Sequence, residues 1–235
     1  MVSISGLYIS PPHYPKVVTM RYRKNSAFTM IELILVIIII GILAALAIPR
    51  MNRDIRQELG DNILSAIRYT QHLALMDNMT DPTDSNWQKK YWHLRFGSYG
   101  NPSKFFYTIS SDRDENANVD KVETAIDPAN GKYFYHLAGD ATLNESDESP
   151  NIFISKKYGI SQITYTGGCN GGQLIAFDHL GRPHVGIYSG SNDFGTYMKQ
   201  TCTMTFSFSD SSINPISITI LPETGYAQIV GNDNS

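Results

Sequence analysis

The segment from residue 112 to residue 123 carries oxygen-bearing side chains in a spacing that suits cation binding. In the stretch DRDENANVDKVE, positions one, three, five, seven, nine and twelve hold Asp112, Asp114, Asn116, Asn118, Asp120 and Glu123. An EF-hand loop places its calcium ligands at these positions and closes on a bidentate glutamate. The segment therefore predicts a calcium site, in which Asn118 contributes its main-chain carbonyl and the other five residues contribute side chains.

Two features of this segment differ from an EF-hand. Ala117 stands at the sixth position, where glycine normally makes the sharp turn, and the preceding residues 104–110 have a strand pattern rather than a helical one. Blocks of charged residues are usually solvated surface loops, so this alternative stays open. Calcium is the one cofactor that the sequence suggests, and none is required.

Two cysteines, Cys169 and Cys202, are the whole complement of thiols. They form no C-x-x-C motif, which makes a zinc site a poor explanation. If the body of the protein lies outside the cytoplasm, a disulfide between them is expected. Two buried, reduced thiols are the alternative.

Catalytic motifs are missing from the sequence. It contains no H-E-x-x-H, P-loop or G-x-S-x-G pattern, and its six histidines are scattered. His179 and His184 flank a turn signal at residues 180–183, where we expect exposed polar side chains. The sequence therefore predicts no catalytic residues and a protein that is not an enzyme.

An apolar run from residue 28 to residue 48 dominates the N-terminal part of the chain. As a helix it would extend about 31 Å, which matches a bilayer core of about 30 Å. Arg21, Arg23 and Lys24 precede it, and such basic residues remain on the cytoplasmic side. We expect residues 28–48 to form a transmembrane helix. A cleaved secretory signal, with a site among Ala44, Ala45 and Ala47, is the alternative.

The charge distribution separates a basic head from an acidic body. Residues 1–27 carry four basic residues and no acid, whereas residues 28–235 carry 15 basic and 22 acidic residues. Binding to nucleic acid requires clustered Lys and Arg, so a nucleic-acid partner is not expected. Glu32 lies inside the apolar run, where an ionised group usually has a partner. An α-amino group at Phe28 would be the nearest cation if the chain were cut before that residue.

The junction RKNSA–FTMIEL, residues 23–33, resembles the signal of type IV prepilins and type II secretion pseudopilins. The resemblance implies that prepilin peptidase cuts between Ala27 and Phe28 and N-methylates Phe28. It also implies that Glu32 pairs with a neighbouring subunit during assembly, and that Gly41 and Pro49 interrupt the helix. Ala27 departs from the family, which usually has glycine there.

The same resemblance implies a location and a set of partners. Residues 1–27 would be the leader, with residues 1–19 a misassigned start before Met20. The subunit would cross the bacterial inner membrane once, with a cytoplasmic N-terminus and a periplasmic head, and would then enter a periplasmic or extracellular filament. Expected partners are prepilin peptidase, other pilin or pseudopilin subunits, an inner-membrane assembly platform and membrane lipid.

The remaining sequence predicts a helix followed by strands. Apolar residues at three- to four-residue spacing continue the helix through residues 49–79, and a coiled coil is the weaker alternative because the stripe is short. Strand patterns occupy 91–96, 104–110, 151–155, 161–166, 173–178, 184–188, 202–208, 216–221 and 226–230. We expect an α+β fold in which a long N-terminal helix packs on an antiparallel β-sheet, with a pilin-like head at residues 80–235.

The C-terminal half gives a weaker resemblance to H-type pseudopilins and minor pilins. It is carried by Asp178 and Gly181 in one turn and by Thr224 and Gly225 in another. These resemblances together imply a structural subunit of an envelope-spanning filament, either a type II secretion pseudopilin or a minor type IV pilin. A membrane-anchored extracytoplasmic binding module or adhesin that never polymerises is the alternative.

Overall fold

The computed structural model describes residues 29–189 and 195–230, and the side chains of these residues except 45–54. The predicted leader and the predicted cleavage site at Ala27 and Phe28 lie outside the described residues. The chain divides into two compact units, Met1–Ala45 and Leu46–Ser235. We describe each unit by itself.

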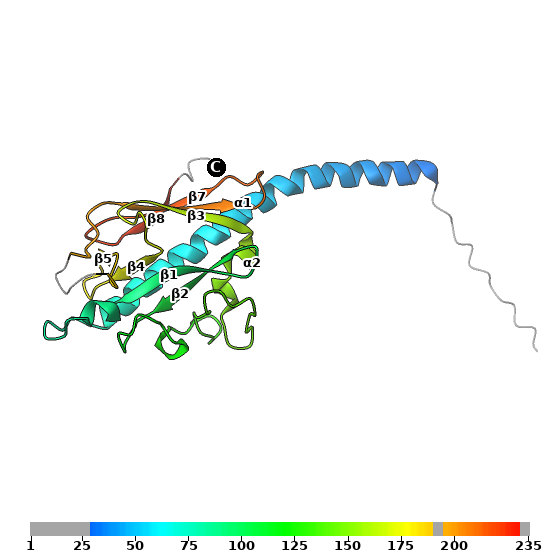
Figure 1. The fold of residues 1–235 in the computed structure, drawn as a ribbon. Coiled ribbons are helices and arrows are strands. Elements are labelled where there is room, and N and C mark those ends of the chain that lie inside the picture. The colour runs from blue at the N-terminus through cyan, green and yellow to red at the C-terminus, as the bar shows by residue number, and fades with distance from the viewer. Residues whose placement is uncertain (1–28, 190–194, 231–235) are drawn as a thin grey trace, which may run out of the picture. The chain divides into compact units, whose positions relative to one another are not determined.

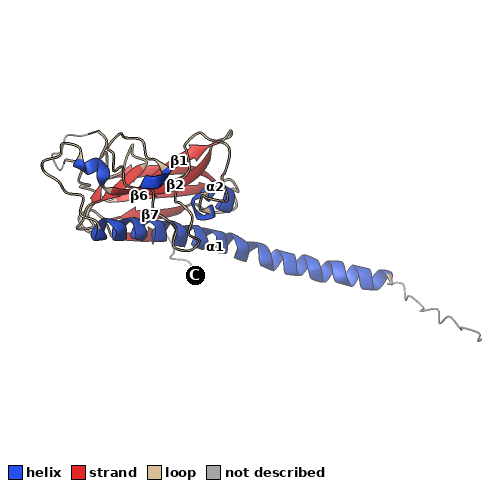
Figure 2. Ribbon diagram, turned by 90° about the horizontal axis from the view of Figure 1, so that it is seen from below, coloured by secondary structure: helices blue, strands red, loops and turns tan. Residues whose placement is uncertain are grey.

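One long helix, α1 (Met30–Met76), contains both Gly41 and Pro49, so the expectation that these residues interrupt the helix is wrong. It ends three residues before the predicted boundary at residue 79. The Asn78 side chain accepts a hydrogen bond from the Thr80 N–H at 3.0 Å, which is the local turn that Asn favours over helix. The second half of α1 lies along the sheets in both views (Figures 1 and 2).

Within the described residues, eight strands form two antiparallel sheets of four strands each, where the sequence suggests one sheet. The first sheet has the order β2–β1–β4–β5, with β1 (Trp92–Tyr99), β2 (Lys104–Ser110), β4 (Leu174–Phe177) and β5 (Pro183–His184). The second has the order β3–β6–β7–β8, with β3 (Ile160–Gly167), β6 (Cys202–Phe208), β7 (Ile216–Ile220) and β8 (Ala227–Val230). The predicted α+β fold, with an N-terminal helix packed on antiparallel strands, is confirmed.

The two sheets and the second half of α1 share one core. Phe96 of the first sheet and Phe206 of the second meet with ring centroids 5.7 Å apart. On α1, Leu59, Ile63 and Ile67 are fully buried. Helix and sheet approach closely at Gly60, where a Cβ would lie 2.6 Å from the Cδ1 of Ile229. Burial of large apolar faces from both sheets explains why the strands separate into two layers.

The predicted strand at 151–155 is wrong, because this segment is helical. A 3₁₀ turn, η3 (Pro150–Ile152), leads into the short helix α2 (Ile154–Tyr158). Ser149 caps η3 by accepting a hydrogen bond from the Asn151 N–H, and Gly159 ends α2 in the left-handed conformation at φ 73°. Proline at the first helical position and glycine after the last are typical helix boundaries.

Two further 3₁₀ turns complete the described elements. They are η1 (Trp87–Lys90) and η2 (Lys121–Glu123). Strand β5 is also shorter than the predicted segment 184–188, because the chain turns at Gly186, whose φ is 67°.

The residues that carried the C-terminal resemblance converge on the end of α1. Gln71 Nε2 donates hydrogen bonds to the carbonyls of Gly181, at 2.8 Å, and Thr224, at 2.9 Å. Gly225 has φ 65°, and a Cβ there would lie 2.4 Å from the Gly181 carbonyl oxygen. Only glycine fits this approach, so the two turns and α1 form one tightly packed junction.

Asp178 holds the first of these turns in shape. Its Oδ1 accepts the N–H groups of Leu180 and Arg182, and its Oδ2 accepts the Arg182 Nε–H at 2.7 Å. Burial opposes its ionisation, but the hydrogen bonds from His184 and Arg182 lower the pKa of Asp178. His184 is 1% exposed, so the expectation of an exposed turn residue is wrong there.

A disulfide joins Cys169 and Cys202 in the structure, with their Cα atoms 5.0 Å apart. The two residues are separated by 33 positions in the sequence. The bond connects the turn that follows β3 to the first residue of β6. Both side chains are buried.

Candidate functional sites

The start of α1 shows what Glu32 does within a single chain. The N–H and Oγ1–H of Thr29 donate to Glu32 Oε2 at 3.2 and 3.1 Å, and the Glu32 N–H donates to Thr29 Oγ1 at 3.3 Å. This reciprocal arrangement is a capping box, which satisfies helix N-terminal N–H groups. The pattern T-x-x-E at residues 29–32 is its sequence signal, and reasoning from the sequence overlooked it.

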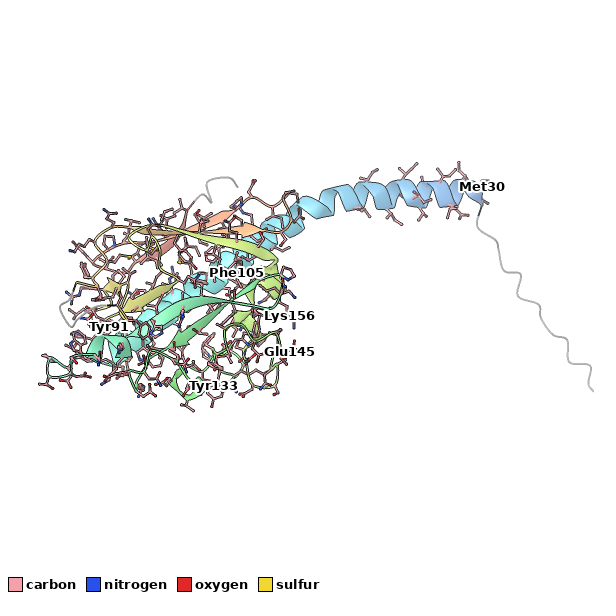
Figure 3. All side chains as sticks on the ribbon, viewed as in Figure 1. Met30, Tyr91, Phe105, Tyr133, Glu145 and Lys156 are labelled. Atoms are coloured by element: carbon pink, nitrogen blue, oxygen red, sulfur yellow. A yellow bond between two sulfur atoms is a disulfide. The ribbon has the colours of Figure 1, made fainter. Side chains whose placement is uncertain are left out.

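The apolar side chains of the first α1 turns project outward from the helix within this unit (Figure 3). From Met30 to Leu43, the large apolar side chains are 42–84% exposed. At Gly41, a Cβ would meet nothing within 4 Å. The single chain therefore gives no packing reason for glycine at this position.

None of the helices within the described residues combines the length and the apolar character needed to cross a membrane.

The acidic loop lies between β2 and η2, and the structure brings three of its predicted ligands together. Asp112, Asp114 and Glu123 each offer a carboxylate oxygen, and these oxygens lie within 4.8 Å of one another. Asp112 is fully buried and Glu123 is 7% exposed, whereas Asp114 is exposed. Three convergent carboxylates at this spacing could hold a hard cation such as calcium.

Main-chain N–H groups orient these carboxylates. Glu123 Oε1 accepts from the N–H groups of Arg113, at 2.8 Å, and Asp114, at 3.2 Å, while its Oε2 accepts from the Asp120 N–H at 2.9 Å. Asp112 Oδ2 accepts from the Ala117 N–H at 2.9 Å. The loop is therefore wrapped around its first and last acidic residues.

One oxygen in the loop has no hydrogen-bond partner among the described residues. It is Asp112 Oδ1, which is buried. Buried carboxylate oxygens nearly always have a partner, and an unpaired one is costly. Burial raises the pKa of Asp112, and the neighbouring carboxylates of Asp114 and Glu123 raise it further. A bound cation would give Asp112 Oδ1 a partner and would offset the cost of ionising the buried Asp112 carboxyl.

Ala117 takes the conformation that an EF-hand loop requires of its sixth residue. Its φ is 65°, in the left-handed region that glycine usually occupies, and Glu115 has φ 62°. For a residue with a Cβ this conformation costs about 1–2 kcal/mol. The absence of glycine therefore does not prevent the turn.

The other three predicted ligands are Asn116, Asn118 and Asp120, of which Asn116 contacts a member of the cluster. Asn116 Oδ1 accepts the Asn118 N–H at 2.7 Å, and its Nδ2 donates to Asp114 Oδ2 at 2.8 Å. Asn118 and Asp120 are exposed, and Asp120 does not belong to the group of three carboxylates.

Ion pairs tie the acidic loop to the segment that follows α1. Lys90 Nζ lies 2.8 Å from Asp84 Oδ2 and 2.5 Å from Glu115 Oε1. Arg113 Nη2 and Trp92 Nε1 both donate to Asp77 Oδ2 at 3.2 Å, one residue after the end of α1. These contacts thus hold the acidic loop against the segment that connects α1 to β1.

The comparisons with known proteins bear on the N-terminal segment. Residues 22–48 match the prokaryotic N-terminal methylation motif. This N-terminal segment is type IV prepilin-like. The motif marks a structural subunit that is processed by prepilin peptidase and assembles with other pilin subunits, and it indicates anchoring in a membrane. Searches among curated proteins and among solved structures find no match to this chain.

Proposed function

We propose that this protein is a minor subunit of an envelope-spanning filament, either a type II secretion pseudopilin or a minor type IV pilin. The observation that carries the proposal is the methylation motif at residues 22–48, which runs directly into a helix with an outward-facing apolar surface. Support for a minor subunit comes from Asp178, Gly181, Thr224 and Gly225, which meet at the end of α1 and resemble the H-type pattern.

In this proposal the helix that begins at Met30 anchors the subunit in the inner membrane and later packs in the filament. Prepilin peptidase cuts between Ala27 and Phe28, which frees the α-amino group of Phe28. Glu32 then exchanges its bond to Thr29 for the N-terminal ammonium of a neighbouring subunit. In a medium of low dielectric constant, this charge-assisted pairing offsets the cost of burying either charge alone and sets the axial register.

Two variants separate the capping role of Glu32 from its charge. Glu32→Gln removes the charge but can still complete a capping box, because glutamine also serves at that position. Thr29→Ala removes the cap, at a cost of about 0.5–2 kcal/mol to the helix, but keeps the charge. We expect Glu32→Gln subunits to be cleaved yet to be missing from sheared filaments, and Thr29→Ala subunits to enter them. Normal incorporation of Glu32→Gln would contradict the proposed pairing.

We further propose that the acidic loop binds calcium through Asp112, Asp114 and Glu123, with the remaining coordination supplied by water and by loop oxygens. Support comes from the three convergent carboxylates, the unpartnered Asp112 Oδ1 and the left-handed turn at Ala117. Calcium would stabilise the loop and, through Arg113 and Lys90, the segment after α1.

A further inference from the structure

A polar hollow lies beside strands β1 and β2 of the first sheet, next to the acidic loop. Two recesses, of about 380 and 410 Å³, share three lining residues, namely Arg95, Ala117 and Gln173. The two recesses therefore adjoin at Arg95, and we call them together the Arg95 cleft. Its size falls within the range of small-molecule sites.

The floor of the Arg95 cleft is formed by the paired strands β1 and β2, and the Phe106 ring within it is buried, with 2% of its surface exposed. In the register of β1 and β2, Gly97 stands opposite Phe106, and a Cβ on Gly97 would lie 2.6 Å from the Cζ of the Phe106 ring. The ring therefore lies across the glycine. Around this floor stand neutral hydrogen-bonding side chains, Thr108, Asn118, Tyr135 and Gln173.

Arg95 is the one arginine among the residues that line these recesses, and none of them is a lysine, an aspartate or a glutamate. Within the described part of the chain, its guanidinium makes no hydrogen bond and no ion pair, whereas Arg113 pairs with Asp77 and Arg182 pairs with Asp178. An arginine remains charged at all accessible pH values and presents a fork of N–H donors that matches a carboxylate. An exposed fork that has no partner among the described residues, beside a hollow, is suited to an anionic ligand.

We propose that the Arg95 cleft binds a small, hydroxyl-rich carboxylate such as a sugar acid. A single arginine, with no lysine in the lining, suits one negative charge better than a phosphate. The amide and hydroxyl groups of the rim suit the hydroxyls of a saccharide. This site is separate from filament assembly and does not depend on it.

The acidic loop forms one wall of the cleft through Ala117 and Asn118. Burial raises the pKa of Tyr188, which lines the cleft, and the charge of Asp112 raises it further while that of Arg95 lowers it. The charges of Asp112 and Arg95 therefore both act on the Tyr188 hydroxyl. Because calcium at Asp112 would change the charge near the cleft, binding of an anionic ligand is tested with calcium and without it.

The test titrates galacturonate into the full-length protein in detergent, by calorimetry or ligand-observed NMR, in calcium and in chelator. We expect millimolar binding in calcium, which corresponds to about −4 kcal/mol. Galactose, which lacks the carboxylate, should bind at least tenfold more weakly. Arg95→Gln should weaken galacturonate binding at least tenfold, since a charge-assisted hydrogen bond is lost.

The matched control is Arg68→Gln on α1, because Arg68 is also exposed and lines neither recess. This variant should bind galacturonate as the wild type does. The proposal is overturned if the wild type shows no saturable binding in either condition, if galactose binds as well as galacturonate, or if Arg95→Gln binds as well as Arg68→Gln.

Discussion

Replacing Asp112 with asparagine should stabilise the calcium-free protein and abolish its stabilisation by calcium. Burial and two neighbouring carboxylates raise the pKa of Asp112, so the unfolded chain ionises this group more readily than the folded chain. Ionisation near neutral pH therefore opposes folding. In Asp112→Asn, the amide oxygen can still accept the Ala117 N–H, and the amide nitrogen can donate to Asp114 or Glu123. We expect a gain of about 1 kcal/mol in the calcium-free protein.

Calcium should stabilise the wild type and so reduce the stability advantage of Asp112→Asn. Extracellular calcium modules have Kd values of about 10⁻⁴–10⁻³ M, so 1 mM calcium would stabilise the wild type by about 0.4–1.4 kcal/mol. For a head of this size, the thermal midpoint would rise by about 1–6 °C. Asp112→Asn removes a buried ligand and should lose this rise.

The assay is thermal unfolding of the full-length protein in detergent, with calcium or with chelator. Asp61→Asn is the control, because Asp61 is an exposed α1 carboxylate whose bond from Gln57 an amide oxygen can keep. It should retain the calcium-dependent rise. The reasoning is refuted if the wild-type midpoint is the same in calcium and in chelator, or if Asp112→Asn keeps the rise.

Three further predictions concern the head. Replacing both Cys169 and Cys202 with alanine should cost about 4 kcal/mol, because the bond closes a loop spanning 33 positions; an unchanged denaturant midpoint in the variant would argue against this. Gly225→Ala should cost about 1–3 kcal/mol more than Gly131→Ala in denaturant unfolding, because both have positive φ but only Gly225 faces a carbonyl at 2.4 Å; equal costs would show that the junction adjusts. Burial lowers the pKa of His93 to about 4, so the free energy of unfolding should fall by about 3 kcal/mol at most as the pH drops from about 6.5 to about 4. In unfolding experiments at a series of pH values, His93→Gln should make this fall smaller. An unchanged dependence on pH in the variant would exclude His93 as its source.

The periodic spacing of apolar residues in the sequence predicted the helix and the strand that bury one face. The apolar stripe at Ile55, Leu59, Ile63 and Ile67 predicted the packed face of α1, and alternation at residues 202–208 predicted the bounds of β6. Segment 151–155 misled because a short apolar run fits a strand and a buried helical turn equally well. The caps Ser149 and Gly159, which lie outside the run, decided between them.

Long-range pairing was beyond what the sequence could predict. The division into two sheets depends on β1 pairing with β4, more than 70 residues later, and no local pattern encodes that choice. The acidic loop was predictable because its ligand spacing is local, although its internal hydrogen bonds at Asn116 were not. Arg95 had no signal, because a single arginine in a strand becomes notable only when the fold leaves it unpaired beside a hollow.

The mature N-terminus tests the central claim most directly. Intact-mass and peptide mass spectrometry of the protein from its native envelope would identify the first residue and any modification on it. The account predicts a chain that begins at Phe28 with an N-methyl group, as the motif at residues 22–48 implies. A chain that retains residues before Phe28, or that begins after Ala44, Ala45 or Ala47, would contradict it.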